Sequence, residues 1–379
     1  MIEFNKKLIF RKFFFDNTYF FLSAIFTLGI IVWVIQAVNF LDFVTEDGHG
    51  LGVYFKYSLL NFPKIISRLF PLIFFISIFY TLNKFEDNNE LKIFWINGIN
   101  KINFVKNLVF YSFFSLIFLY FFTSFLVPWS QNKSRIFLKD SNIDFFPSLI
   151  GEKKFIDTVD KLTIYIEKKI DKENYENIFL KDTDNEKIKF IYASKGKLIN
   201  NDNERNLKLF DGKIINVNNE KITSFDFETT NFDLGKYLTK SITDFKIQER
   251  KTSDILGCYI NYFILGNQSY YETTQCNDPA IKEMQKELFN RLIKPLFIPI
   301  LTLILCFLLV IPKENVRYKF SRILIFSIGL VIIIFSELFS TMTSKNFFYF
   351  KLSIIIPLLI FLIQYFFLYF KINTFRKEL

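Results

Sequence analysis

The chain has very few residues of the kinds that bind metals or form covalent intermediates. It holds one histidine, three cysteines and three methionines among 379 residues. The histidine, His49, lies between two glycines, where we expect a solvated turn, and one histidine cannot form a histidine-rich metal site. Neither a phosphate-binding G-x-x-x-x-G-K-[ST] loop nor a G-x-S-x-G nucleophile motif occurs. The sequence therefore predicts no enzyme, no metal and no cofactor of its own.

Cysteine usage leaves one question open. Cys306 lies inside an apolar run and is expected to be a packing residue. Cys258 and Cys276 fall in the polar central part of the chain, and they could pair if that part lies outside the cytoplasm. Pairing cannot be deduced from sequence, so free thiols and a disulfide both remain open here.

Aromatic residues are abundant, and basic residues exceed acidic ones. Phenylalanine supplies 53 residues, more large rings than a soluble domain could bury, whereas lipid accepts them. The net charge of +10 would suggest a nucleic-acid partner in a soluble protein. Here much of the positive charge flanks apolar runs and no groove-reading motif accompanies it, so we predict a membrane protein and no nucleic acid.

Long stretches without charge, apart from Glu337 in the fifth, lie near both ends of the chain. They cover residues 17–41, 69–83, 107–132, 295–312, 323–344 and 352–370. About 20 apolar residues cross a bilayer. The second stretch is short, so its helix is expected to begin near Pro63 and to include Lys64 and Arg68. The first is too long for a cleavable signal peptide. The pattern predicts six transmembrane helices, three before and three after a polar centre.

Basic residues gather in four segments that lie on one side if there are six spans. They are Lys6, Lys7, Arg11, Lys12, Lys84, Lys92, Lys101, Lys106, Lys313, Arg317, Lys319, Arg322, Lys371, Arg376 and Lys377. Cytoplasmic loops are enriched in lysine and arginine. Both termini are therefore expected in the cytoplasm, and the central domain outside it.

The polar centre is predicted to form β-strands. Leu162–Ile166 is rich in β-branched and aromatic residues, and later runs alternate between apolar and polar. Asp211-Gly212 is a turn signal between two such runs. We expect an antiparallel sandwich or roll in residues 133–285. Transmembrane helices 1–3 would then occupy 1–132, and helices 4–6 would occupy 286–379.

A short amphipathic segment lies between the second and third spans. Glu90 opens it, Leu91, Phe94 and Trp95 supply apolar positions, and Gly98 ends it. Such a helix suits docking into a partner's groove. It also suits simple packing under the bundle, and the pattern alone favours packing.

At this spacing the segment resembles the coupling helix of LptF and LptG, the paired permease subunits of the lipopolysaccharide exporter. Other features of the resemblance follow along nearly the whole chain. They are Pro63 and Pro71, Val127-Pro-Trp-Ser130, the Tyr165-Ile166 strand, an Ala193-x-x-Gly196 turn, a strand ending at a Gly212 turn, a Phe-x-Phe strand and the segment 287–295. Trp33, Gln36, Phe40-Leu-Asp42 and Gly50 are more similar to the LptF branch.

The resemblance implies a fold, a location and partners. The fold would be an α-helical inner-membrane protein with an inserted periplasmic β-jellyroll-like domain. The partners would be an LptB-like ATPase dimer, a sister LptG-like permease, LptC-like and LptA-like periplasmic proteins, and lipopolysaccharide. ATP would be bound and hydrolysed by the partner. A coupling helix at about 84–100 would meet the ATPase through Glu90, Leu91, Phe94 and Gly98, although Lys92 and Trp95 depart from the family's small apolar residues.

Four basic residues near the outer ends of the spans are candidates for lipid contact. Lys64 and Arg68 share a helical face, and Arg291 and Lys294 mark the start of the fourth span. They are expected either to snorkel toward headgroups or to bind the phosphates of lipid A. Glu337, inside the fifth span, would pair with a basic residue on another span or cap a polar patch; both readings stay open.

The resulting hypothesis is a permease subunit that extracts lipopolysaccharide from the inner membrane and passes it to a periplasmic bridge. Two alternatives remain. One is a membrane scaffold or sensor with an external β-domain and no ATPase partner. The other is the permease of a different lipid, lipoprotein or peptide exporter, a class that usually has four spans per subunit.

Overall fold

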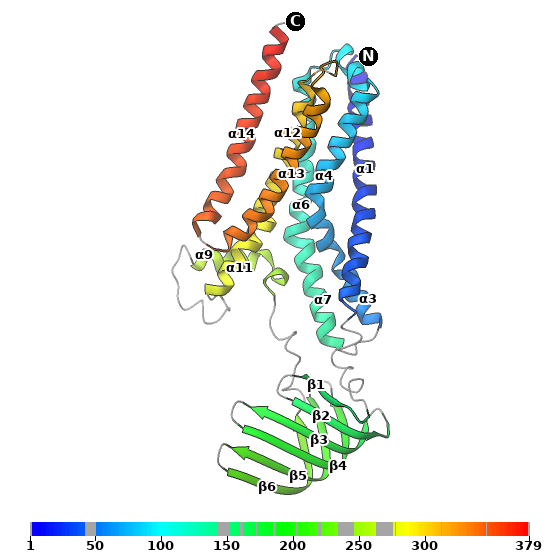
Figure 1. Cartoon of the computed structure of the whole chain (residues 1–379), viewed down its shortest axis with the longest axis vertical. Coiled ribbons are helices and arrows are strands. Elements are labelled where there is room, and N and C mark those ends of the chain that lie inside the picture. Colours follow the sequence, from blue (N-terminus) through cyan, green and yellow to red (C-terminus); the bar gives the residue numbers. More distant parts are fainter. Residues whose placement is uncertain are drawn as a thin grey trace. The chain divides into compact units, whose positions relative to one another are not determined.

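The computed structural model describes most of the chain in two compact units (Figure 1). The described residues are 2–41, 51–141, 152–159, 162–171, 173–184, 187–201, 204–218, 221–233, 246–262, 276, 278–311, 313–345 and 347–377. One unit, called the helical unit, comprises residues 1–35, 61–132 and 246–379. The other, called the β unit, comprises residues 36–60 and 133–245.

The described helices confirm the predicted membrane character. Six stretches are long and apolar enough to cross a bilayer, namely Leu8–Asn39, Leu51–Asp87, Lys101–Phe137, Ala280–Leu309, Tyr318–Thr343 and Phe347–Asn373. The helices are α1 (Ile2–Asn39), α3 (Leu51–Leu60), α4 (Phe62–Asp87), α5 (Glu90–Ile96), α6 (Lys101–Phe121), α7 (Val127–Ser141), α9 (Thr252–Ile260), α11 (Asp278–Leu288), α12 (Phe297–Cys306), α13 (Tyr318–Thr343) and α14 (Phe347–Lys377). The predicted grouping of three spans and three spans is therefore correct.

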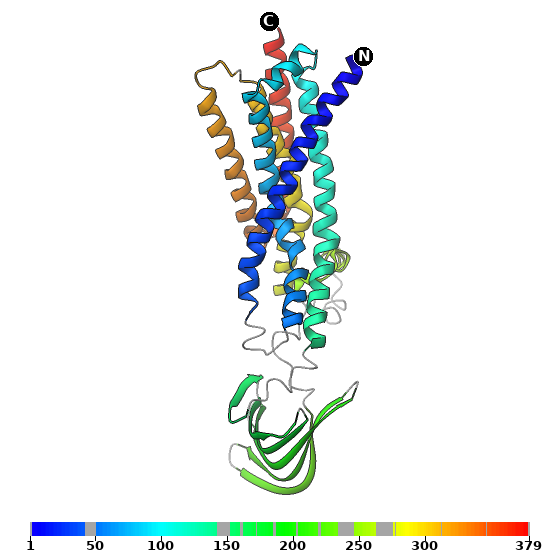
Figure 2. The same ribbon diagram turned by 90° about the vertical axis from the view of Figure 1, so that its right-hand side faces the viewer.

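Helix α12 is the centre of the helical unit. All of its residues are buried, and it packs against α4, α6, α13 and α14. A helix that is apolar on every side needs neighbours on every side, and α12 has them (Figure 1, Figure 2). Cys306 is fully buried at its end, as predicted for a packing residue.

A buried polar cluster joins α1, α4 and α6. Asn17 is 1% exposed, and its side-chain oxygen accepts hydrogen bonds from Ser77 and Thr81 at 2.9 and 3.2 Å. Its amide nitrogen donates to the hydroxyl of Tyr111 at 3.1 Å. Polar contacts of this kind hold membrane helices together where hydrophobicity gives no preference for one neighbour.

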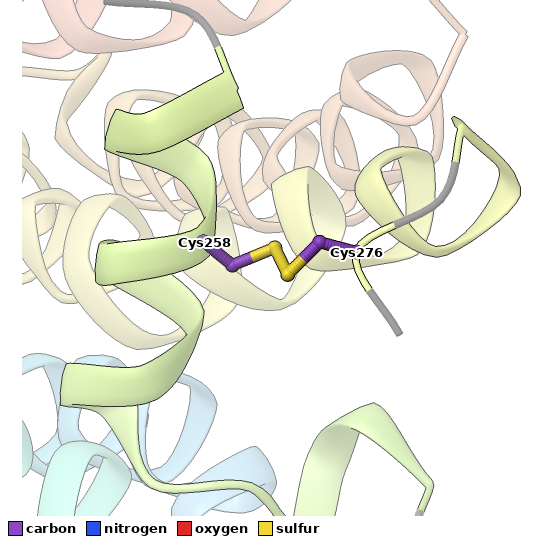
Figure 3. Close-up of a disulfide and its surroundings, with 2 residues drawn as sticks. All are labelled: Cys258 and Cys276. Carbon is purple, nitrogen blue, oxygen red and sulfur yellow. A yellow bond between two sulfur atoms is a disulfide. The ribbon is translucent and has the colours of Figure 1, made fainter. Parts of the chain in front are cut away.

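The two central cysteines form a disulfide, which settles the question that the sequence left open. Cys258 on α9 is joined to Cys276, which precedes α11, with a Cα–Cα distance of 6.1 Å (Figure 3). Both side chains are buried in the helical core. The bond ties α9 to the chain that leads into the fourth span.

The described strands of the β unit form one antiparallel sheet in chain order. They are β1 (Phe155–Val159), β2 (Leu162–Lys169), β3 (Asn174–Asp184), β4 (Lys187–Asn201), β5 (Glu204–Asn218) and β6 (Lys221–Asp233). Figure 2 shows that the sheet curves strongly. The predicted all-β insert is confirmed, and its jellyroll character stays a prediction because the described strands pair only with their chain neighbours.

One face of this sheet carries the apolar core of the β unit. The buried residues come from β2 to β6 and include Ile166, Leu180, Ile191 and Leu209, each at most 2% exposed. Alternate positions of a strand point to opposite faces, so Tyr165, Phe179 and Tyr192 lie on the other face. The alternation that predicted the strands thus also separates their two faces.

A row of polar residues crosses three neighbouring strands. The register places Asn177 opposite Ser194, and Ser194 opposite Asp211. Asn177 and Asp211 have left-handed φ values of 50° and 49°, which bends each strand without shifting the register. The buried positions change phase there, since Ala193 is followed three residues later by buried Gly196.

Two predicted turns are therefore wrong. Ala193 and Gly196 lie within β4, and Asp211 and Gly212 lie within β5. A Cβ atom on Gly212 would lie 2.1 Å from the carbonyl oxygen of Tyr192, so glycine is needed here for close approach between bent strands rather than for a chain reversal.

The predicted boundary at residue 285 falls inside the helical unit. The sheet ends at Asp233, and residues from 246 onward group with the helices. Within the β unit, helix α3 packs on the end of α1, where the Tyr54 hydroxyl donates to the carbonyl of Ala37 at 2.9 Å.

Candidate functional site

The predicted coupling segment forms a short helix, α5, between α4 and α6. Asn89 precedes it with a φ of 60°, and Gly98 follows it with a φ of 73°. The amide of Gly98 donates to Trp95, and the amide of Ile99 donates to Phe94. These bonds satisfy carbonyls at the helix end in the way that a glycine C-cap allows. Gly98 therefore ends α5, as the sequence predicted.

Helix α5 has a buried face and an exposed face. Leu91 and Phe94 are 2% and 4% exposed, and the Phe94 ring lies 6.0 Å from the ring of Phe85 on α4 and 5.9 Å from that of Phe104 on α6. These two side chains hold the helix on the bundle and are not accessible to a partner, which corrects the expectation of direct contact through them.

The exposed face consists of residues that the sequence analysis did not select. Ile93 and Ile96 are 53% and 84% exposed, and Lys92 is exposed between them and the buried face. Helical spacing gives the signal that could have found them, because Ile93 and Ile96 are three apart and offset from Leu91 and Phe94. Ile93 and Ile96 together form a small exposed apolar surface on α5, of the kind that can contact a partner.

Glu90 forms an ion pair within the chain. Its carboxylate accepts a hydrogen bond from Nζ of Lys12 on α1 at 2.8 Å and one from the side-chain amide of Asn88 at 3.3 Å. Partial burial acts to raise the pKa of Glu90, but the bonds from Lys12 and Asn88 outweigh it and lower that pKa. Glu90 is therefore ionised and anchors α5 to α1.

An ion pair and two hydrogen bonds from a lysine connect α5 and the end of α4 to the segment before α13. Nζ of Lys92 lies 2.7 Å from a carboxylate oxygen of Glu314. Lys313 donates to the last carbonyls of α4, those of Glu86 and Asp87, at 3.2 and 3.0 Å. A cation at a helix C-terminus complements the helix dipole. The end of the helical unit that carries α5 is thus held by charges from three separate parts of the chain.

The four basic candidates for lipid contact lie at the other end of the helical unit, and Arg291 is not available there. It is 2% exposed on the π-helix η5 (Phe289–Ile293). Its guanidinium donates to Glu287, to the Thr252 hydroxyl and to the carbonyls of Gln248 and Arg250, at 2.8 to 3.0 Å. All three nitrogens of the guanidinium already donate hydrogen bonds, which leaves few donors for a phosphate. These bonds hold residues 248–252 on the bundle.

Lys64 and Lys294 are also engaged. Nζ of Lys64 donates to the side-chain oxygen of Gln248 at 2.6 Å and to that of Gln131 at 3.4 Å. Lys294 forms an ion pair with Glu337 on α13, which answers what Glu337 does: it pairs with a basic residue of another span. Intramembrane charges are commonly paired in this way.

Arg68 differs from the other three. Its side chain is exposed, and among the described residues no hydrogen bond or ion pair involves it. The structure therefore leaves Arg68, of the four candidates, with its guanidinium open to a ligand. The sequence could not make this distinction, because three of the four groups that Arg291 contacts belong to residues 39 to 43 positions earlier in the chain.

Six apolar helical stretches, with an antiparallel sheet inserted between the third and fourth along the chain, define a multi-pass membrane protein. The described residues contain no cluster of three or more potential metal ligands. The family described as lipopolysaccharide export system permease LptF/LptG matches residues 9–371. This match covers nearly the whole chain, so the protein belongs to that family. The match does not separate the LptF branch from the LptG branch.

One curated relative is similar to about half of this chain. The uncharacterized protein RP871 of Rickettsia prowazekii (strain Madrid E) is 26% identical over 196 residues. The aligned region is 50% of this chain and 53% of the relative, so the chain spans about half the length of the curated relative that it matches.

Proposed function

We propose that this protein is the LptF-like permease subunit of an ABC transporter that extracts lipopolysaccharide from the inner membrane. A partner LptB-like ATPase dimer binds and hydrolyses ATP, and a sister LptG-like permease completes the transport path. The lipid then passes through the β unit to LptC-like and LptA-like proteins. Family membership over residues 9–371 carries this proposal.

Charge and the disulfide support an orientation in the membrane. The end of the helical unit that carries α5 is rich in lysine and arginine, which favours the cytoplasm. Cys258 and Cys276 are joined, and disulfides persist in the periplasm rather than in the cytoplasm. Lys64 lies beside Gln248, which is four residues before Thr252, the first residue of α9. Asp87 is about 35 Å further along α4. We therefore place α5 in the cytoplasm, the α9 end outside, and both termini with α5.

Docking of the ATPase is assigned to the exposed face of α5. Ile93 and Ile96 are the apolar contacts, Lys92 adds charge, and Leu91 and Phe94 fix the helix from behind. Glu90 acts by anchoring α5 to Lys12. Buried apolar side chains at a partner surface usually carry most of the binding energy, so Ile96 is the central residue.

At the outer end, Arg68 is assigned to a lipid phosphate. Its guanidinium has five donors that match phosphate oxygens, and Lys64, Arg291 and Lys294 support the same region through contacts within the chain. The walls around the acyl chains are apolar and non-directional, as extraction of a lipid requires.

Co-purification tests the assignment of α5. The full chain is expressed with an LptB-like ATPase and a sister permease from the same source, and the complex is isolated from detergent. We expect Ile96→Asp to reduce recovery of the ATPase by about tenfold or more, because an ionised carboxylate would be buried without a partner. Glu90→Lys should give a smaller loss by releasing α5 from Lys12.

Ile170→Asp serves as the matched control, since Ile170 is 53% exposed at the end of β2. It should leave recovery of the ATPase unchanged. A scaffold or sensor without an ATPase partner would recover no ATPase with the unmodified chain, and that outcome would remove the transporter assignment.

A further inference from the structure

A groove lies between α4 and α13 at the end of the helical unit that carries α5. It consists of two adjoining cavities, of about 630 Å³ and about 410 Å³. Both are lined by Phe79 and Asn83 of α4 and by Arg322 and Phe326 of α13. We call this feature the α4–α13 groove. The lining includes neither the exposed face of α5 nor the four basic residues at the outer end.

The mouth of the groove is basic. Lys84 lines the larger cavity and Lys319 the smaller one, and both side chains are exposed. Arg322 is engaged by Asp87 through two hydrogen bonds of 3.1 and 2.9 Å. No ion pair in the described part of the chain involves Lys84 or Lys319, so the mouth presents two positive charges beyond the neutral Arg322–Asp87 pair.

Deeper in the groove an acceptor is left without a donor. Asn83 is 7% exposed, and its amide nitrogen donates to the carbonyl of Phe79 at 2.8 Å. Its side-chain oxygen is buried and has no hydrogen-bond partner among the described residues. A buried acceptor without a donor costs free energy, which a hydroxyl or ammonium group of a ligand would recover.

The remaining lining is aromatic. The rings of Phe79 and Phe326 lie 4.7 Å apart, and those of Phe20 and Tyr80 stack at 4.3 Å across α1 and α4. Tyr80 is 45% exposed and Ile323, beside the smaller cavity, is 66% exposed. The apolar part of the groove therefore continues into surface that suits hydrocarbon.

We propose that the α4–α13 groove binds an anionic glycerophospholipid of the adjoining leaflet. Its phosphate lies between Lys84 and Lys319, a headgroup hydroxyl donates to Asn83, and the upper acyl chain follows Phe79 and Phe326. Basic residues at a membrane surface attract anionic headgroups, and the apolar lining favours a lipid over a free phosphate. Placing this leaflet on the cytoplasmic side rests on the proposed function.

The lipid would act on the α5 end. Its phosphate lies beside the Arg322–Asp87 pair that fastens α4 to α13, one turn before Glu90. An anion there competes with Asp87 for Arg322 and adds its own bridge between the two helices. The groove thus couples the surrounding membrane to the position of α5.

Native mass spectrometry of the full chain in nonionic detergent tests the proposal. Phosphatidylglycerol is titrated against the unmodified protein, the double variant Lys84→Gln and Lys319→Gln, and Asn83→Leu. We expect saturable binding of one lipid, weakened by about thirtyfold in the double variant and by about fivefold in Asn83→Leu. Lys106→Gln is the matched control, because Lys106 is an exposed lysine on α6 at the same end.

Three results of the titration itself would overturn the proposal. They are equal affinity for phosphatidylcholine and phosphatidylglycerol, an equal loss in Lys106→Gln, and full competition by glycerol phosphate, which would assign the groove to a soluble anion. Displacement of the lipid by the sister permease would place a protein there and overturn it as well. The titration contains no ATPase and no lipopolysaccharide, so its failure leaves the proposed function intact, and failure of co-purification leaves the lipid site intact.

Discussion

Arg291 is a charged side chain whose partners all lie within the chain. It is 2% exposed, and its guanidinium is shared between Glu287 and three groups of residues 248–252. Removing one partner of a buried ion pair leaves an uncompensated charge. Arg291 therefore contributes several of the hydrogen bonds that hold residues 248–252 on the bundle, beside those of Lys64 with Gln248 and of Thr252 with Ser124.

Replacing Arg291 should destabilise the protein. Arg291→Met removes the donors to the Glu287 carboxylate and to the carbonyls of Gln248 and Arg250. We expect a loss of about 3 to 5 kcal/mol in the free energy of unfolding. Arg291→Lys keeps the charge but not the planar geometry and should lose less. Thermal unfolding in detergent measures both effects.

Arg68→Met is the control for that experiment, since Arg68 is exposed. It should leave the unfolding temperature nearly unchanged and reduce lipopolysaccharide binding instead. If Arg291→Met unfolded like the unmodified protein and lost only lipid, Arg291 would be a phosphate ligand and not a clamp.

At the scale of the element, the bent strands of the β unit are the clearest case. Asn177, Ser194 and Asp211 lie on one row, and the strands bend there together. Ser194 donates its hydroxyl to the carbonyl of Asp211 at 3.0 Å, which links the bends of β4 and β5. The curvature is a property of the row and not of any one strand.

Gly212 is predicted to be essential for this bend. In Gly212→Ala the new methyl group would meet the Tyr192 carbonyl oxygen at 2.1 Å and the Phe227 ring at 2.5 Å. We expect a loss of about 1 to 3 kcal/mol, seen as faster hydrogen exchange in β4 and β5. Gly257→Ala is the control, because nothing lies within 4 Å of a Cβ atom there. Equal exchange in both variants would contradict the account.

The sequence predicted the helices and strands better than it predicted where strands bend and which side chains contact one another. Charge-free runs predicted all six spans, because a bilayer demands about 20 apolar residues, and alternation predicted the strands from Leu162 onward. Asp211-Gly212 carried a turn signature, yet whether such a pair reverses a strand or bends it depends on the neighbouring strands. The accessible face of α5 was missed for a related reason: burial of Phe94 depends on rings of α4 and α6.

On the scale of the whole molecule, the disulfide supports the proposed orientation in the membrane. Cys258 and Cys276 are joined in the helical unit, whereas Cys306 is buried in α12. If the α9 end is periplasmic, the bond forms only in cells with an intact oxidising pathway. Charge distribution and redox state are independent indicators of the same orientation.

Thiol labelling checks this orientation. In denaturant we expect Cys306 alone to react with a maleimide before reduction, and all three cysteines to react afterward, because the thiols of Cys258 and Cys276 become free only on reduction. Cys258→Ser with Cys276→Ser should lower the free energy of unfolding by about 2 to 4 kcal/mol, and Cys306→Ala is the control that keeps the bond. Two free thiols without reductant would place the α9 end in the cytoplasm.

The buried position of α12 has a consequence for biosynthesis. Its neighbours α4 and α6 are made before the β unit, and α13 and α14 are made after α12 itself. The early helices must therefore wait in the bilayer, with their central place unfilled, while more than a hundred residues of polar chain are translated. Only the late arrival of α12 completes the bundle, so a ribosome that stops within the β unit leaves a half that cannot close.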